Sequence, residues 1–109
     1  VGASSKVLLA YAAPEVREAV LNDPAWPASL DREAFVRQLE EIAKNGYATS
    51  IEEREPGAAA VAAPIFNRSG RLVAALAVSG PSNRLTPGVM RKYAPILMEA
   101  ARRMGTMLG

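Results

Sequence analysis

The sequence predicts an α+β fold in which a small antiparallel sheet is flanked by helices. Three observations support this class. Phe35, Leu39 and Ile42 recur at helical spacing, two apolar runs follow one another across the turn at residues 67–70, and a further helical pattern closes the chain. Strands joined as a hairpin pair antiparallel, and we expect the helices to cover one face of their sheet. A length of 109 residues fits one compact domain.

Three helices are predicted in the first half of the chain. The serines at residues 4–5 can cap a first short helix. Pro14 suits the first turn of a second helix, which ends at residues 22–24, because proline lacks only a donor that is unused there. Asp31 is a good N-cap for a longer third helix. The Asn-Gly pair at residues 45–46 ends that helix, since glycine accepts left-handed backbone.

Three strands are predicted after these helices. Residues 47–51 are a short strand candidate, and the apolar runs 58–66 and 71–79 form a hairpin around the turn-forming residues 67–70. Both runs are rich in alanine, which is unusual for strands. Small side chains on a sheet either let a helix pack close or leave room for a ligand.

The last helix is expected to open at Thr86 as the cap, with Pro87 at its first position. Apolar residues then recur every three or four positions, which predicts one buried stripe along the helix. That stripe comprises Val89, Tyr93, Leu97, Ala100, Met104 and Leu108.

Cysteine and histidine are both absent from the sequence. Disulfides, thiolate nucleophiles and zinc–thiolate sites are therefore excluded, and a hydrolase triad, a haem site or a catalytic zinc site is not expected. Glu52, Glu53 and Glu55 form the main carboxylate cluster, for which a Ca²⁺ site is weighed against a solvated loop tip, the favoured interpretation. Lys6 and Lys44 form no paired catalytic constellation with it. We expect no metal, no cofactor and no enzymatic activity.

Charge and hydropathy narrow the class of protein further. The 13 basic and 11 acidic residues are interspersed, without the basic stripe of a DNA-binding domain. The longest apolar run, residues 58–66, is far too short to span a membrane, and no signal-peptide pattern is found. A cytoplasmic protein without membrane association is expected. Because the sequence opens at Val1 without methionine, it is expected to be a piece of a longer chain.

Short segments over nearly the whole chain share their order and spacing with one known family. They are Gly2-Ala3-Ser4-Ser5-Lys6-Val7-Leu8-Leu9-Ala10, Gly46-Tyr47-Ala48, Glu52-Glu53, Gly57, Ala62-Ala63-Pro64-Ile65, Ala75-Leu76-Ala77-Val78-Ser79-Gly80-Pro81 and Leu108-Gly109. A single piece such as Ser-Gly-Pro is a weak signal, whereas this many in register is a strong one. The chain therefore resembles the effector-binding domain of bacterial transcription regulators of the IclR type.

The resemblance implies that residues 1–109 are part of a GAF-like effector-binding and oligomerisation domain. The family's N-terminal winged helix-turn-helix and the first part of the effector domain are expected to lie outside this chain, so DNA would be a partner only through that missing domain. It implies a homodimer or homotetramer that binds a small organic acid. A change in protomer arrangement would then alter operator binding, in a repressor or an activator. The alternative is a ligand-free dimerisation or scaffold module.

The resemblance also implies a ligand pocket, carried over position by position. Its residues are Ala3, Ser4, Ser50, Ala58, Ala60, Ala77 and Ser79. Backbone N–H groups at a helix N-terminus attract an anion, so the start of the first helix suits a carboxylate. Other interpretations stay open: Ser4 as a helix cap, Ser79 as a turn residue, and the alanines as packing against a helix.

Two positions depart from several relatives of the resembled family. Those relatives have an acidic residue in place of Ser50 and a hydroxyl in place of Ala77. Together with the alanines at 58, 60 and 62, these departures widen the expected space and make it less polar. An aromatic or branched organic acid is therefore the expected effector, rather than a two- or three-carbon keto acid.

Overall fold

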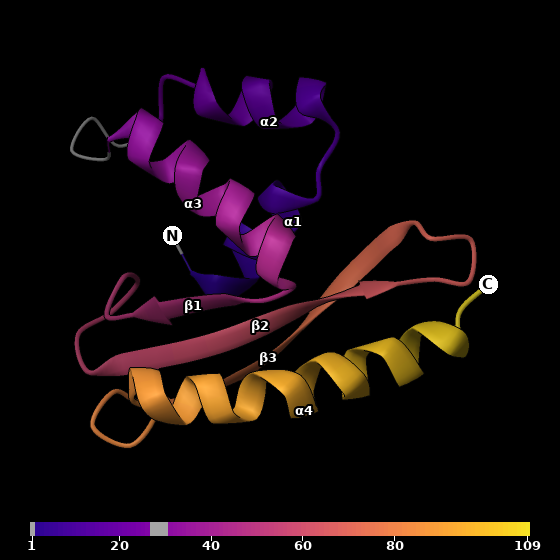
Figure 1. Ribbon diagram of the computed structural model, residues 1–109. Coiled ribbons are helices and arrows are strands. Elements are labelled where there is room, and N and C mark those ends of the chain that lie inside the picture. The colour runs from indigo at the N-terminus through magenta and orange to yellow at the C-terminus, as the bar shows by residue number, and fades with distance from the viewer. Residues whose placement is uncertain (1, 27–30) are drawn as a thin grey trace.

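The computed structural model describes residues 2–26 and 31–109 and has the predicted α+β class (Figure 1). A three-stranded antiparallel sheet has the strand order β1-β2-β3. In chain order the elements are α1 (Ala3–Ala10), α2 (Pro14–Leu21), α3 (Arg32–Asn45), β1 (Ala48–Ile51), β2 (Ala58–Phe66), β3 (Leu72–Pro81) and α4 (Pro87–Thr106).

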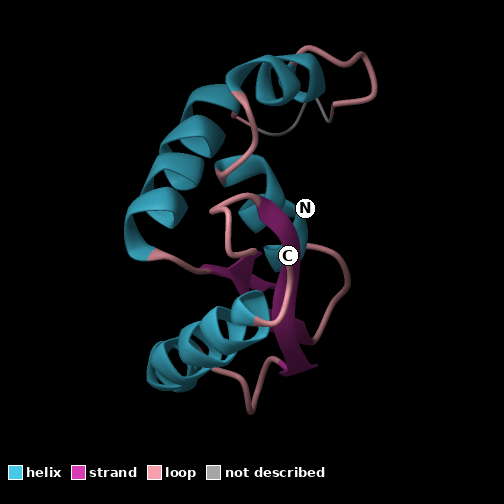
Figure 2. Ribbon diagram, turned by 90° about the vertical axis from the view of Figure 1, so that its right-hand side faces the viewer, coloured by secondary structure: helices cyan, strands magenta, loops and turns pink. Residues whose placement is uncertain are grey.

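Helices cover both faces of the sheet, so the expectation of helices on one face was wrong. α1 packs on one face with α3 above it, and α4 runs along the other (Figures 1 and 2). The reason lies in β2, whose consecutive residues Val61 and Ala62 point to opposite faces and are both fully buried. A central strand that is apolar on both sides needs cover on both sides.

The starts and ends of the helices follow local chemistry, with one exception. The Asp31 carboxylate accepts hydrogen bonds from the N–H groups of Glu33 and Ala34 at 3.0 and 3.2 Å, which confirms this cap. Gly46 has a φ of 87°, the left-handed conformation that was predicted. α1 is the exception: Gly2 is its N-cap and no side chain caps it. The serines at residues 4–5 therefore lie inside the first turn, and their predicted capping role was wrong.

The hairpin runs further than predicted. β2 has the predicted bounds, whereas β3 spans Leu72–Pro81 rather than residues 71–79. Gly80 pairs with Ala59, and the ladder continues one pair beyond it, because both strands stay extended past the expected turn. Ser79 is thus a strand residue opposite Ala60, and its interpretation as a turn residue was wrong.

The buried stripe of α4 is displaced by one residue at most positions. Thr86 caps the helix as predicted, since its hydroxyl accepts from the Val89 N–H at 3.4 Å. Tyr93, expected in the core, is 47% exposed. The buried residues are instead mostly small and let α4 lie close to β2. They are Met90, Ala94, Leu97, Ala101 and Gly105.

The exposed side of α4 carries an ion-pair cluster around Glu99. Arg102 donates to its carboxylate at 2.6 and 3.0 Å, and Arg103 donates at 3.3 Å. The pKa of Glu99 is lowered to about 2 from an ordinary 4.5. The largest cause is the hydrogen bonding from Arg102, and the positive charges of both arginines add to it. The carboxylate therefore keeps its charge in acid that would neutralise it in the unfolded chain.

This lowered pKa predicts an acid-dependent loss of stability. A carboxylate whose pKa is depressed by folding stabilises the fold above its unfolded pKa, and this contribution disappears as the pH falls through its folded pKa. Between about pH 5 and about pH 2, the Tm of Glu99→Gln should therefore fall less than that of the unmodified chain. Circular dichroism melts measure the difference, which should be small and shrink with added salt because the pair is exposed. Equal falls in Tm at low salt would contradict the prediction.

Candidate functional site

The seven residues predicted to bind a ligand line one cavity of about 420 Å³ between the start of α1 and the sheet. Ser4 and Ser79 thus lie on the same side of the molecule. The cavity is lined by Gly2, Ala3, Ser4, Ser5, Ser50, Arg54, Glu55, Ala58, Ala59, Ala60, Ala77 and Ser79. The structure brings the predicted set together, while its role in binding remains a prediction.

Strand register builds the floor of the cavity. Ser50, Ala60 and Ser79 stand directly opposite one another across β1, β2 and β3. Ala77 follows two residues from Ser79 on β3, and Ala58 two residues from Ala60 on β2, so both pairs share a face. The result is a floor of methyl groups with a hydroxyl group at each side.

The start of α1 forms the opposite wall. Ala3 is buried, and Ser4 is half-buried in the first helical turn. The first N–H groups of a helix have no acceptor within the helix and carry its positive dipole end. The wall facing the hydroxyl-edged floor is therefore suited to an anion.

Lys6 ties α1 to the sheet rather than lining the cavity. Its side chain is fully buried, and Nζ donates to the Thr49 carbonyl at 2.5 Å and to Glu53 Oε2 at 2.8 Å. The Glu53 side chain is 34% exposed. Lys6 was considered above as a catalytic residue. Its two hydrogen bonds instead hold α1 against β1 and the loop that follows.

Two charged residues of the cavity wall, Arg54 and Glu55, were missed by the sequence prediction. Both belong to the loop between β1 and β2. A Cβ added to Gly2 would lie 2.6 Å from Arg54 Cδ, so the Arg54 stem rests directly on that glycine. The signal that was available is their position between two strands that both carry predicted site residues.

Two of the three carboxylates of the acidic loop have hydrogen-bond partners. Glu52 accepts from the Gly57 N–H at 2.7 Å, and Glu53 accepts from Lys6. Within residues 2–26 and 31–109, no group of three or more acidic side chains lies close enough to hold a metal ion. In the same ranges, no helix has the length and apolar character needed to cross a membrane.

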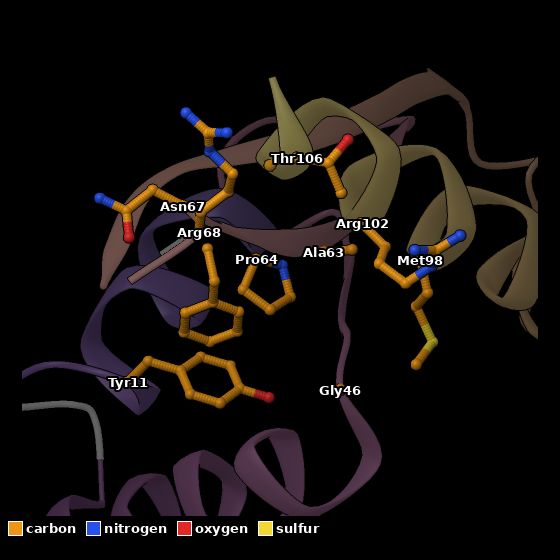
Figure 3. Close-up of a pocket in the computed structure, with 11 residues that line it drawn as sticks. Tyr11, Gly46, Ala63, Pro64, Asn67, Arg68, Met98, Arg102 and Thr106 are labelled. Carbon is orange, nitrogen blue, oxygen red and sulfur yellow. The ribbon is translucent and has the colours of Figure 1, made fainter. Parts of the chain in front are cut away.

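A second cavity of about 400 Å³ lies at the other end of the hairpin, between Tyr11, Pro64 and Met98 (Figure 3). None of the predicted site residues lines it. Phe66 packs edge-on against Tyr11, with ring centroids 5.2 Å apart, and burial raises the pKa of Tyr11. In Figure 3 the Arg68 side chain extends away from the Tyr11 ring. This hollow is mainly apolar, although Arg68 and Arg102 also line it, and Arg102 is paired with Glu99.

Comparison with known proteins connects this architecture to one family. Residues 1–106 match a family model described as the C-terminal region of the bacterial transcriptional regulator IclR. The chain is 30% identical over 112 residues to the regulator KdgR of Escherichia coli, covering 98% of this chain and 43% of KdgR. It is 36% identical over 104 residues to the regulator BhcR of Paracoccus denitrificans, covering 91% of this chain and 37% of BhcR. The chain thus spans less than half the length of these relatives.

Solved structures show the same fold. The inducer-binding domain of PobR from Acinetobacter, a double mutant in complex with 3-hydroxybenzoic acid, has a TM-score of 0.85 and 27% identity. The match covers 97% of this chain and 64% of that one. The C-terminal domain of Escherichia coli KdgR has a TM-score of 0.80 and 30% identity over 95% of this chain and 66% of its own.

Proposed function

This chain belongs to the family of C-terminal domains of bacterial IclR transcriptional regulators, and from that premise we propose that it senses a small organic acid for a one-component regulator. Its relatives are transcription regulators and not enzymes. The observation that best supports sensing is the cavity of about 420 Å³ in which all the predicted site residues meet. Cavities of a few hundred Å³ are typical of sites for small organic ligands.

The proposed pose places the carboxylate at the start of α1, near the N–H groups of Ala3 and Ser4. Hydroxyl groups of Ser50 and Ser79 then flank the ligand, and its hydrocarbon part lies on the alanine floor. An aromatic or branched acid fills this space better than a two- or three-carbon keto acid. The PobR domain, solved with 3-hydroxybenzoic acid, supports an aromatic acid as the first ligand to test.

The proposed mechanism is a shift between arrangements of the protomers. A homodimer or homotetramer in the cytoplasm would present DNA-reading domains, supplied by other parts of the full regulator, at a spacing that the effector changes. The acid must bind one arrangement more tightly than the other, because equal affinity shifts nothing. This coupling is reciprocal, so operator DNA would also change the affinity for the acid.

A ligand-free association module is the second candidate, and one observation favours it. Apolar side chains on α4 are exposed, with Ile96 at 65% and Tyr93 at 47%. Exposed apolar groups on one helix suit a protein interface. A module of this kind would self-associate, yet no small acid would raise its Tm.

A melting-shift screen with a matched pair of variants tests the sensing proposal. Benzoate and branched acids should raise the Tm of the chain in a saturable way, whereas glyoxylate and pyruvate should have little effect. Ala60→Leu fills the cavity floor and should weaken benzoate binding by at least about tenfold. Ala100→Leu adds the same side chain on the exposed side of α4 and should leave binding unchanged.

Three results would each contradict part of the proposal. Tight, saturable binding of glyoxylate or pyruvate without binding of benzoate would overturn the preference for a larger acid. Self-association with no stabilisation by any acid would instead favour the association module. Unchanged benzoate affinity in Ala60→Leu would move the binding site away from this cavity.

A further inference from the structure

We infer that Arg54 and Glu55 set the charge specificity of the cavity, so that it accepts acids with one carboxylate and rejects acids with two. The inference rests on the proposed function and adds the class of acid. Arg54 and Glu55 are the charged residues on the cavity wall, and every other lining residue is glycine, alanine or serine. One cation and one anion therefore govern the electrostatics of an otherwise neutral space.

Arg54 is held beside the start of α1. A Cβ added to Gly2 would lie 2.6 Å from Arg54 Cδ and 3.7 Å from Nε, so the stem and the start of the guanidinium lie over the N-cap of this helix. The preceding residue, Glu53, is bound to the buried Lys6 of the same helix at 2.8 Å. Two neighbouring residues of the loop, Glu53 and Arg54, thus contact the start of α1.

This arrangement brings two attractions for an anion together. The free N–H groups of the first turn of α1 favour negative charge, and a guanidinium forms strong, directional hydrogen bonds with carboxylates. Ser50, which is only 5% exposed, faces the same cavity and has no side-chain hydrogen bond to the described part of the chain. Its hydroxyl is available to a ligand oxygen. The part of the cavity at the start of α1 therefore offers several hydrogen-bond donors to one carboxylate.

A second carboxylate on the ligand would meet the opposite conditions. Away from Arg54 the floor is made of Ala58, Ala60 and Ala77, which offer no partner to a charge. A charge moved from water to such a surface loses its hydration without compensation. The carboxylate of Glu55 on the same wall adds like-charge repulsion. The cavity should therefore exclude dicarboxylic acids of the same size.

The test compares benzoate with isophthalate, the same ring with a second carboxylate, by calorimetric titration of the chain and of its variants. The unmodified chain should bind benzoate at least about tenfold more tightly than isophthalate. Arg54→Gln should weaken benzoate binding by about tenfold, and Arg54→Lys by less, since the charge remains but the planar fork is lost. Glu55→Gln should raise the affinity for isophthalate more than that for benzoate, and so narrow the difference in affinity between the two acids. Arg68→Gln removes an exposed arginine outside this cavity and should change neither affinity.

The outcomes separate this inference from the function on which it rests. Benzoate binding in Arg54→Gln equal to that of the unmodified chain would overturn the role of Arg54. An unchanged preference in Glu55→Gln would overturn that of Glu55. If the unmodified chain binds neither these acids nor any other in the melting-shift screen, the sensing function itself fails. Melting curves of the variants show whether the fold is retained, which is expected because both residues are exposed.

Discussion

Replacing Gly105 with alanine should destabilise the chain by about 2 kcal/mol, although alanine is the better helix former. Gly105 is buried in α4, where the helix lies against the backbone at the end of β2. A Cβ at this position would overlap the Phe66 carbonyl oxygen and lie 3.1 Å from the carbonyl carbon. Backbone atoms cannot turn aside as a flexible side chain does, so the helix must move away from the sheet.

Gly88, in the first turn of the same helix, provides the matched control. The nearest atom to a Cβ at Gly88 is the tip of the Arg91 side chain at 3.9 Å, so alanine fits there without displacement. Gly88→Ala should leave stability unchanged or raise it by up to about 1 kcal/mol, the usual advantage of alanine over glycine. Urea unfolding gives the free energy of unfolding of both variants. Similar values for the two would contradict the close approach of α4 to β2.

The second large effect is expected at the ion pair between α1 and the loop after β1. The Lys6 side chain is 1% exposed and that of Glu53 is 34% exposed. Water can therefore replace Lys6 as the partner of Glu53, but it cannot replace Glu53 as the partner of Lys6. Glu53→Ala leaves a buried ammonium group with the Thr49 carbonyl as its remaining partner, and should cost about 2 to 3 kcal/mol. Lys6→Met keeps the side-chain volume and leaves a carboxylate that water reaches, so it should cost less, about 1 kcal/mol.

This asymmetry is the measurable result. Urea unfolding near neutral pH should rank Lys6→Met as more stable than Glu53→Ala, with Glu53→Gln between them because its amide oxygen still accepts from Nζ. Glu40→Ala, on the exposed side of α3, removes a carboxylate without disturbing the pair and should change stability by less than about 0.5 kcal/mol. A larger loss in Lys6→Met than in Glu53→Ala would show that burial of Lys6 is not what makes the pair costly to break.

Much of the secondary structure could be predicted because the determining interactions are local. Asp31 caps its own helix two and three residues ahead, Gly46 ends that helix with its own backbone, and Thr86 caps α4 within one turn. Where the local argument failed, a distant contact replaced it. Ser79 looked like the start of a turn, but pairing with Ala60 keeps it in the strand.

The candidate site was predicted in part, for a related reason. The resemblance to a family supplied its alanines and serines at fixed positions, and the strand register places Ser50, Ala60 and Ser79 in one row. Arg54 and Glu55 could not be assigned in this way. Their place on the cavity wall depends on how a loop folds back onto Gly2, more than fifty positions away in the chain.

The residues alone were enough for the fold class, the hairpin, most helix ends and the membership of a family, because caps, turns and apolar runs arise between near neighbours. Three-dimensional packing was needed to establish that helices cover both sheet faces and which side of α4 is buried. It also determined which charges face the cavity. These features depend on contacts such as Gly105 with Phe66 and Lys6 with Glu53, whose partners lie tens of residues apart. The periodicity of apolar residues along a helix does not show which side of that helix can pack closely against the sheet, because this depends on the residues of the sheet.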